Sequence, residues 1–370
     1  MIIERLELID FRNYRHAVFA LTSGTTVVIG DNGQGKTNFA EAMAYLGTLT
    51  SFRAAPPEAL VRVGANAAIV RADVRDDDGR LVLIEAELVP GGRSRVQINR
   101  QRLVRARDLL GAVRVTVFSP DDLTLVKGGP ADRRRFVDDT LVGLAVKYDA
   151  ARLELDRIVR QRNMLLRQCG GRLDETTTAT LEVWDARLAT AGERFGHARA
   201  TMVARIEPHV AAAYAWLAGT TSTIGLVYDP PWRSVGLMAA LAAARELDVR
   251  RGVSTVGPHR DELVLSINGL SARTHASQGE QRTLALALRL GAHRLIAERT
   301  GSIPVLVLDD VLSELDGGRA GALLRHLPSG QVVITTAGAV PPAATQERTL
   351  RITAGAVVDE DEQPLDAGVS

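Results

Sequence analysis

The stretch Gly30-Asp31-Asn32-Gly33-Gln34-Gly35-Lys36-Thr37 decides the fold of this chain. It follows the apolar run Val27–Ile29 and precedes a helical pattern from Asn38 to about Leu49, which is the strand, glycine-rich turn and helix of a P-loop. Glycines let the backbone close around an anion, and the free N–H groups at the helix start favour negative charge. The sequence therefore predicts a nucleoside triphosphate site, in which Lys36 reaches the β- and γ-phosphates and Thr37 offers its hydroxyl to Mg²⁺.

The composition sets limits on the rest of the chain. Its 370 residues are 46% hydrophobic and 24% charged with a formal net charge of +1, so any contact with nucleic acid has to come from local patches. The single cysteine, Cys169, excludes an internal disulfide and fits a reducing compartment. No apolar run approaches the roughly 18 residues of a membrane span, and Met1–Leu6 alternates like a strand. We therefore expect a cytoplasmic protein.

The N-terminal part has the pattern of a series of strands around a polar break. Strands are expected over residues 1–9, about 14–30, 67–75, 80–89, 94–99 and 113–118. Within the break, Arg12 and Asn13 precede the P-loop strand. These two side chains either contact the nucleotide or form an ordinary strand-end cluster, and the sequence leaves both interpretations open.

Residues 93–107 form an arginine-rich segment, which comprises a predicted hairpin and the residues that follow it. No acidic residue occurs between residue 93 and Asp108, and such a run suggests contact with a phosphate backbone. The alternative is a solvated surface in a chain that is rich in arginine throughout. The candidate DNA-binding residues are Arg93, Arg95, Arg100, Arg102, Arg105 and Arg107.

Two long helical patterns occupy the middle of the chain. Apolar residues recur at heptad spacing over about 141–168, where Arg162 breaks the pattern, and again over about 176–218. The turn Gly170-Gly171 separates them, and residues 219–233 are expected to be irregular. The two helices form either an extended antiparallel arm or part of a compact bundle, because periodicity alone does not distinguish them.

A pair of carboxylates ends a buried strand in the C-terminal part. The apolar run Val305–Leu308 leads directly into Asp309 and Asp310. Asp309 is placed to hold Mg²⁺ beside Thr37, directly or through water. Asp310 can orient or deprotonate the attacking water. The tail from about residue 355 is acidic and is expected to fray.

A second anion site is indicated at the start of the helical run 282–299. Ser277 and Glu280 have the spacing of a capping box, which satisfies the first N–H groups of a helix. Gly279 and Gln281 add features that a plain cap does not need. A helix start of this kind favours negative charge.

Taken together, these motifs resemble those of the ABC-type ATPases. The segment Ser277-Gln278-Gly279-Glu280-Gln281 is similar to their signature, Asp309-Asp310 to their Walker B pair, and Ser313-Glu314-Leu315-Asp316 to their D-loop. The long helical insert resembles that of SMC-type proteins. Three further blocks resemble the RecF family of recombination mediators, and they are Pro120–Asp138, Gly257–Asp261 and Leu308–Leu315.

The resemblance implies an α/β fold, namely an ABC-type P-loop ATPase head formed by the N- and C-terminal segments with an inserted α-helical arm. The implied domains are residues 1–130 (head, Walker A), 131–249 (arm) and 250–370 (head, signature, Walker B and D-loop). In such proteins two heads dimerise on ATP, and each signature serine meets the γ-phosphate held by the other P-loop.

The resemblance also assigns site residues, with ATP and Mg²⁺ as cofactors. Catalytic roles fall to Asp310, Lys36 and Thr336, the last standing where transporters carry a switch histidine. Metal contacts fall to Thr37 and Asp309. The nucleotide-binding residues are Arg12, Asn13, Gly30, Asp31, Asn32, Gly33, Gln34, Gly35, Lys36, Thr37, Asn38, Ser277, Gln278, Gly279 and Glu280.

The partners implied are double-stranded DNA with gaps or junctions, a second copy of the chain, RecR and RecO, and functionally RecA. Three departures from the wider ABC pattern favour slow hydrolysis, with ATP as a timing signal, and the first is Thr336 in place of the switch histidine. The second Walker B carboxylate is Asp310 rather than a glutamate, and residues 119–122 contain no glutamine.

Three other functions are compatible with parts of the pattern. A transporter subunit would cofractionate with membranes, and the long insert argues against it. A P-loop kinase would lack the motif Ser277–Gln281. A structural tether would remain functional when hydrolysis is abolished.

Overall fold

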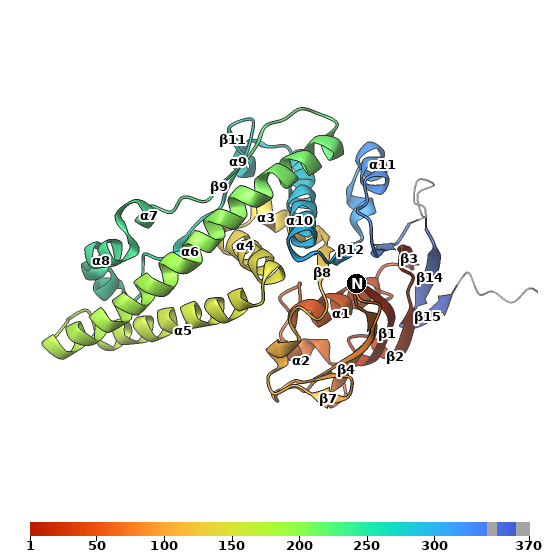
Figure 1. The fold of residues 1–370 in the computed structure, drawn as a ribbon, viewed down its shortest axis with the longest axis horizontal. Helices are drawn as coiled ribbons and strands as arrows, with labels where there is room; N and C mark the ends of the chain where they lie inside the picture. Colours follow the sequence, from red (N-terminus) through yellow and green to blue (C-terminus); the bar gives the residue numbers. More distant parts are fainter. Residues whose placement is uncertain (339–345, 360–370) are drawn as a thin grey trace, which may run out of the picture. The chain divides into compact units, whose positions relative to one another are not determined.

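The structure is a computed structural model, and it describes residues 1–338 and 346–359. The chain forms two compact units. The colours of Figure 1 follow the sequence from the N-terminus (red) to the C-terminus (blue). Unit 1 comprises Met1–Asp122, Trp216–Gly219 and Leu288–Ser370, and unit 2 comprises Leu123–Ala215 and Thr220–Ala287.

A largely parallel sheet carries the P-loop of unit 1. Its strand order is β15-β14-β3-β13-β12-β8, in which only β15 runs antiparallel to its neighbour. Because the carboxyl ends of parallel strands share one edge, the residues that follow β3, β12 and β13 meet there. The strands are β3 (Thr25–Ile29), β8 (Val115–Phe118), β12 (Val305–Asp309), β13 (Val332–Thr336), β14 (Arg348–Thr353) and β15 (Ala356–Asp359).

An antiparallel sheet makes up the rest of the β structure of unit 1, in the order β2-β1-β4-β5-β6-β7. Buried and half-buried residues alternate along β4, as expected for a sheet with one face on a core. The strands are β1 (Ile2–Phe11), β2 (Tyr14–Ala20), β4 (Ala68–Arg75), β5 (Leu81–Leu88), β6 (Arg95–Ile98) and β7 (Gln101–Arg102).

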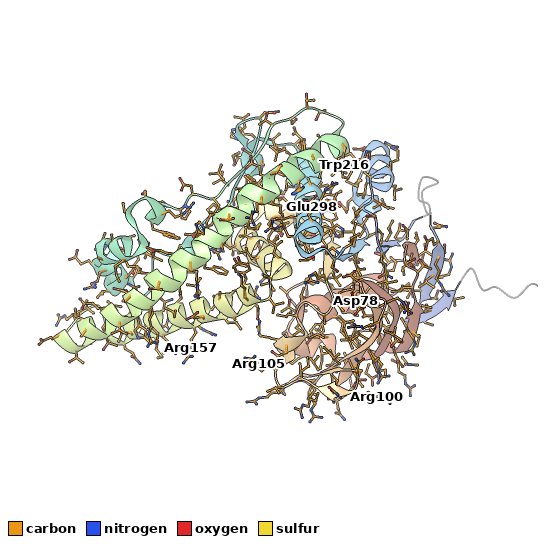
Figure 2. The ribbon with its side chains drawn as sticks, in the orientation of Figure 1. Asp78, Arg100, Arg105, Arg157, Trp216 and Glu298 are labelled. Atoms are coloured by element: carbon orange, nitrogen blue, oxygen red, sulfur yellow. The ribbon has the colours of Figure 1, made fainter. Side chains whose placement is uncertain are left out.

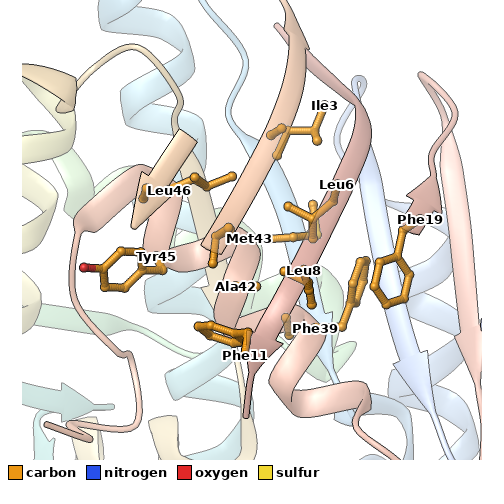
Figure 3. Packing of buried hydrophobic residues seen from close by; sticks show 14 of the residues in the cluster. Ile3, Leu6, Leu8, Phe11, Phe19, Phe39, Ala42, Met43, Tyr45 and Leu46 are labelled. Atoms are coloured by element: carbon orange, nitrogen blue, oxygen red, sulfur yellow. The ribbon is translucent and has the colours of Figure 1, made fainter. Parts of the chain in front are cut away.

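Helix α1 (Lys36–Thr48) contacts both sheets and carries the centre of the core. Figure 3 shows side chains of β1 packed against side chains of α1, with Phe19 of β2 beside them. The rings of Phe19 and Phe39 lie 4.3 Å apart, and Phe19 also meets Tyr14 edge to face. The P-loop helix is therefore fixed by an aromatic cluster. The other helices wholly in unit 1 are α2 (Pro57–Leu60), η1 (Ala106–Leu109), η4 (Val311–Glu314) and α11 (Gly317–Arg325).

Unit 2 is mostly helical, and two of its elements differ from the expectation. The pattern over 141–168 predicted one helix, but the chain breaks at Ala145, whose extended backbone separates α4 from α5. The apolar spacing continues across the break because both helices are buried on one side. Residues 219–233, expected to be irregular, contain β9, which gains order by pairing with β10. The elements are α3 (Thr124–Lys127), α4 (Pro130–Leu144), α5 (Lys147–Gln168), α7 (Trp232–Val235), α8 (Leu237–Arg251), η3 (Pro258–Arg260), β9 (Ile224–Val227), β10 (Val264–Ile267), β11 (Leu270–Ser271) and α9 (Ala272–His275).

The second long helix is confirmed as α6 (Glu175–Ala218), whose 44 residues extend over about 66 Å. It runs beside α5 in Figure 1, and α8 packs with both of them through Leu166, Leu181 and Val249. The helical insert is thus a pair of helices with a third helix packed on it. The last turn of α6 belongs to unit 1, where Trp216 stacks on His326 with ring centroids 4.8 Å apart.

Arg162, which interrupts the apolar pattern of α5, is completely buried. Its guanidinium donates to Asp185 of α6 and Asp248 of α8, each across 2.7 Å. The interruption is therefore an ion-pair cluster within the core of unit 2.

The unit boundaries differ from the predicted domains. Residues 250–287 were expected in the head but cluster with unit 2, because β10 pairs with β9 of the insert. The boundary with the last part of unit 1 lies inside α10 (Gln278–Thr300). The expected fraying from residue 355 is wrong for Ala356–Asp359, which form β15, and residues 360–370 lie outside the described part.

Candidate nucleotide-binding site

The P-loop turn is held closely by its neighbours in unit 1. A Cβ at Gly30 would lie 2.4 Å from the carbonyl oxygen of Ile352, and one at Gly35 would lie 2.7 Å from the Tyr14 hydroxyl. Both glycines also have positive φ angles. Glycine is thus required at these two positions by close packing as well as by backbone conformation.

Lys36 is folded back over the loop that precedes it. Its side-chain ammonium donates to the carbonyl oxygens of Gly30 (2.7 Å) and Asp31 (2.9 Å). These contacts use two of the three N–H donors of an ammonium group. The geometry holds the cation at the mouth of the turn, where the helix start of α1 adds further positive potential.

The carboxyl end of β12 brings the first acidic residue to the P-loop. Asp309 is almost fully buried, and its Oδ1 accepts hydrogen bonds from the hydroxyls of Thr335 (2.7 Å) and Thr37 (3.3 Å). Burial raises the pKa of Asp309, and the charge of Asp310 adds to this, while the two hydroxyls oppose it. The predicted meeting of Thr37 and Asp309 is therefore present in the structure.

Asp310 occupies an unusual backbone position with φ of 51°. Its N–H donates to the carbonyl oxygen (3.1 Å) and to the hydroxyl (3.0 Å) of Thr335. Its Oδ1 is buried and has no hydrogen-bond partner within residues 1–338 and 346–359. An unsatisfied buried carboxylate oxygen is a position that a water or a cation can serve.

These side chains fit Mg²⁺. Thr37, Asp309 and the unsatisfied oxygen of Asp310 are hard oxygen donors, which this ion prefers. In the described part of the chain, no group of three or more His, Cys, Asp or Glu side chains could hold a metal ion. Mg²⁺ is commonly held by one or two carboxylates together with substrate phosphates and water, so this sparse set is sufficient.

The polar break beside the P-loop resolves into two different roles. The guanidinium of Arg12 donates twice to buried Glu41 (2.7 and 2.8 Å) and once to Ala59, which is the strand-end arrangement. Asn13 instead donates to the carbonyl of Gln34 and accepts from Asn38, each at 2.8 Å. Asn13 and Asn38 thus lie on the P-loop, while contact of any of the three with nucleotide stays a prediction.

Thr336 ends β13 and pairs in register with Ile29, the last residue of β3. Its side chain is buried, and its hydroxyl accepts from the N–H of Gly338 at 3.1 Å. The position is at the P-loop edge of the sheet, and the catalytic role of Thr336 stays a prediction.

The capping box of the signature segment is confirmed within unit 2. The N–H of Ser277 donates to Glu280 (2.7 Å), and the N–H of Glu280 donates to the Ser277 hydroxyl (3.3 Å). Ser277 and Gln278 are exposed, whereas Gln281 is buried and donates to two carbonyls of α9. The serine and its neighbour are thus presented to solvent on a rigid helix start.

Two of the sequence blocks near the insert are joined by hydrogen bonds in unit 2. Arg133 makes a bidentate pair with Glu262 (2.7 and 2.9 Å), and Arg134 donates to the carbonyl of Asp261. Arg199 adds a bidentate pair with Asp138. The conspicuous polar residues of these blocks therefore stabilise the core of unit 2.

The six candidate DNA-binding arginines are all exposed. Figure 2 labels Arg100 and Arg105 among the side chains of unit 1. Arg95 pairs with Glu87 (3.5 Å) and Arg105 with Asp108 (3.3 Å). Arg93, Arg100 and Arg102 form no ion pair with any residue that the structure describes. Contact with DNA stays a prediction, and these three arginines are its strongest candidates.

Sequence reasoning missed two features of the site. Thr335 contacts both acidic residues, and the only signal was its place beside Thr336 at the end of an apolar strand. The turn Ala354-Gly355 between β14 and β15 contacts the P-loop, since the N–H of Ala354 donates to Gln34. Its signal was a single glycine near the chain end.

Comparison with known proteins agrees with this geometry. The family described as RecF/RecN/SMC N terminal domain matches residues 2–354. DNA replication and repair protein RecF of Streptomyces avermitilis is 43% identical over 352 residues, which cover 91% of this chain and 93% of that protein. The chain belongs to the RecF family. The RecF protein of Acidothermus cellulolyticus is 39% identical and covers 92% of this chain and 95% of its own length.

Solved structures extend the similarity to the fold. The recombination mediator protein RecF-ATP in the RecFOR pathway has a TM-score of 0.88 and 27% identity, with 96% of this chain and 97% of that chain covered. An Smc head domain from Pyrococcus furiosus shares only the fold, with a TM-score of 0.57 and 18% identity over 96% of each chain. The ABC-type ATPase head expected from the motifs is thereby confirmed as the fold of this RecF family member.

Among the helices of residues 1–338 and 346–359, none combines the length and the apolar character needed to cross a bilayer.

Proposed function

We propose that this RecF family member is an ATP-dependent DNA-binding protein of recombinational repair, with ATP as the switch for dimerisation. The observation that carries the proposal is the contact between Thr37 of the P-loop helix and Asp309 of β12. It joins the phosphate-binding turn to a buried carboxylate whose pKa is raised. This arrangement is typical of sites that bind and hydrolyse a nucleoside triphosphate.

Each site residue of unit 1 has a role in this proposal. The turn Gly30–Gly35 and the ammonium of Lys36 bind the phosphates, and Thr37 and Asp309 hold Mg²⁺. When bound, Mg²⁺ supplies neutralisation of the charge that spreads over the β- and γ-phosphate oxygens. Asp310 accepts a proton from the attacking water or orients it, and its Oδ1, which has no hydrogen-bond partner among the described residues, supports that role. We expect slow turnover, stimulated by DNA.

The exposed signature serine supports a composite site between two copies of the chain. Ser277 sits at a helix start where an anion is favoured, and none of the hydrogen bonds that the structure describes joins its hydroxyl to anything but its own cap. We propose that this hydroxyl meets the γ-phosphate held by the P-loop of a second copy. ATP would then hold the two copies together, and hydrolysis would release them.

The partner of the dimer is proposed to be duplex DNA at gaps or junctions. The exposed arginines of the β6–β7 hairpin support it, because they can release counterions from a phosphate backbone. Since the RecF-ATP structure is described within the RecFOR pathway, we further propose that the protein acts with RecR and RecO to load RecA. We propose that it acts in the cytoplasm, and on the nucleoid when bound to DNA.

Mixing two inactive variants tests the proposal. Lys36→Ala should lose ATP binding, and Ser277→Arg should bind ATP but fail to dimerise, because the bulky side chain obstructs packing around the γ-phosphate. A dimer formed between the two variants carries one site with both substitutions and one intact site. Mixing should therefore restore ATP-dependent cross-linking and part of the hydrolysis.

A matched control separates this effect from a general effect of added charge. Thr190→Arg places an arginine on an exposed position of α6 and should dimerise like the wild type. Hydrolysis by Ser277→Arg alone at the wild-type rate, without cross-linking, would show that each chain works independently. Normal ATP affinity in Lys36→Ala would refute the P-loop assignment.

A further inference from the structure

The hydroxyl of Thr335 connects the two acidic residues of the site. Thr335 is completely buried on β13, directly opposite Asp309 in the register with β12. Its Oγ1 donates to Asp309 Oδ1 across 2.7 Å and accepts from the N–H of Asp310 across 3.0 Å. One side chain on a neighbouring strand therefore contacts both carboxylate-bearing residues.

One of these contacts fixes the Asp309 carboxylate, and the other fixes the backbone of Asp310. The hydrogen bond to Asp309 occupies one lone pair of Oδ1, so it sets the rotation of that carboxylate toward Thr37. The hydrogen bond from the N–H of Asp310 holds that residue in the left-handed backbone conformation, with a φ of 51°. Residues other than glycine uncommonly adopt this conformation. Backbone conformations of this kind persist only when their surroundings determine them.

We propose that Thr335 is a positioning residue, which orients Asp309 toward the metal site and holds Asp310 in the conformation that points its carboxylate at the reacting water. The inference rests on the proposed ATPase function, and it adds a residue that no motif contains. Outer partners that orient metal ligands typically change metal affinity or activity by about 10- to 100-fold when they are removed.

The hydroxyl is the group that matters, so Thr335→Val is the informative change. Valine has the shape of threonine and keeps the backbone carbonyl that also accepts from Asp310. Without the hydroxyl, Asp309 is free to rotate and Asp310 loses one of its two acceptors. We expect Mg²⁺ to be bound about 10- to 100-fold more weakly in the ATP complex, and hydrolysis to fall by a similar factor.

The experiment measures ATP affinity by calorimetry, first in EDTA and then across a Mg²⁺ titration. Thr335→Val should bind ATP in EDTA like the wild type and require a higher Mg²⁺ concentration for the tight complex. Thr335→Ser keeps the hydroxyl and should restore the wild-type Mg²⁺ dependence. A purely structural role would lower the melting temperature of both variants in parallel and leave the Mg²⁺ midpoint in place.

Thr26→Val is the matched control, because Thr26 is a buried threonine of β3 in the same sheet whose hydroxyl contacts Thr22. It should leave the Mg²⁺ midpoint unchanged. An unchanged midpoint in Thr335→Val would overturn the positioning role while wild-type ATP binding upholds the proposed function. Failure of the wild type to bind ATP at any Mg²⁺ concentration would instead overturn the proposed function.

Discussion

The guanidinium of Arg162 donates from Nε to Oδ1 of Asp185 across 2.7 Å, and neither side chain has appreciable contact with solvent. A second donor of Arg162 reaches Asp248 at the same distance, and also the hydroxyl of Ser254 at 2.8 Å. One buried cation thus joins α5, α6 and α8. Arg245 adds a second guanidinium, which donates to Oδ2 of Asp185 at 3.3 Å, so two cations balance the two buried carboxylates.

Replacing Arg162 should therefore unfold unit 2 more readily. In Arg162→Met, buried Asp248 loses its guanidinium partner and Asp185 keeps only Arg245 at 3.3 Å, and removing one partner of a buried pair costs about 3–5 kcal/mol. Urea unfolding should show this loss. Arg157→Met is the control, because Arg157 is exposed on the same helix (Figure 2) and should change stability by less than about 0.5 kcal/mol. Equal losses for both variants would contradict the proposed role of the cluster.

Asp310→Asn should separate ATP binding from hydrolysis. Asparagine keeps the size of the side chain and tolerates the left-handed conformation of residue 310, so the fold should be retained. Loss of the carboxylate should lower the hydrolysis rate by about 10²- to 10⁴-fold, the range expected for a general base. Light scattering with ATP should then show a persistent dimer. Hydrolysis at the wild-type rate would remove Asp310 from this role.

The β6–β7 hairpin makes a prediction about salt. Changing Arg93, Arg100 and Arg102 to alanine should reduce the slope of log affinity for DNA against log salt concentration by about three units, because each lost phosphate contact reduces that slope by roughly one unit. ATP affinity should not change. Arg95→Ala is the comparison, since Arg95 already faces Glu87 and should alter the slope less. An identical slope in the triple variant would mark the hairpin as a solvated surface.

The buried imidazole of His293 in α10 should make the protein less stable in acid. Its two ring nitrogens are buried with no hydrogen-bond partner in the described part of the chain, and burial lowers the pKa of His293 to about 4. The unfolded chain, with a histidine pKa near 6.5, binds the proton more readily, so stability is full above that value and falls as the pH drops toward 4.

At pH 5 this single side chain should cost about 2 kcal/mol relative to pH 7. Urea unfolding at both pH values measures it, and His293→Leu should show a smaller difference between them. The same pH dependence in His293→Leu would show that other groups are responsible.

The parts of the site that local chemistry dictates could be predicted from the sequence. The P-loop is recognisable from the local spacing of its glycines before a helix, although Gly30 and Gly35 also pack against distant residues. Asp309 ends an apolar run that favours a buried strand. Alternation likewise predicted β4 and β5 closely. The capping box of Ser277 and Glu280 is also local, and its two hydrogen bonds are present.

What the sequence could not give depends on partners far along the chain. Arg12 pairs with Glu41 rather than with the P-loop, and Arg162 pairs with Asp248, which lies 86 positions further along the chain. The break at Ala145 could not be predicted because the heptad spacing of apolar residues continues across it. Thr335 gained its contacts only through the register of β13 with β12.

The placement of β3 also governs when the protein can fold. Its neighbours in the sheet are β13 and β14, so the strand that leads into the P-loop pairs only with segments made near the end of synthesis. At ribosomal speeds of 5–20 residues per second, the gap of about 300 residues lasts roughly 15 to 60 s. During that time the apolar strand Val27–Ile29 lacks both of its neighbouring strands, so its sheet can be completed only near the end of synthesis.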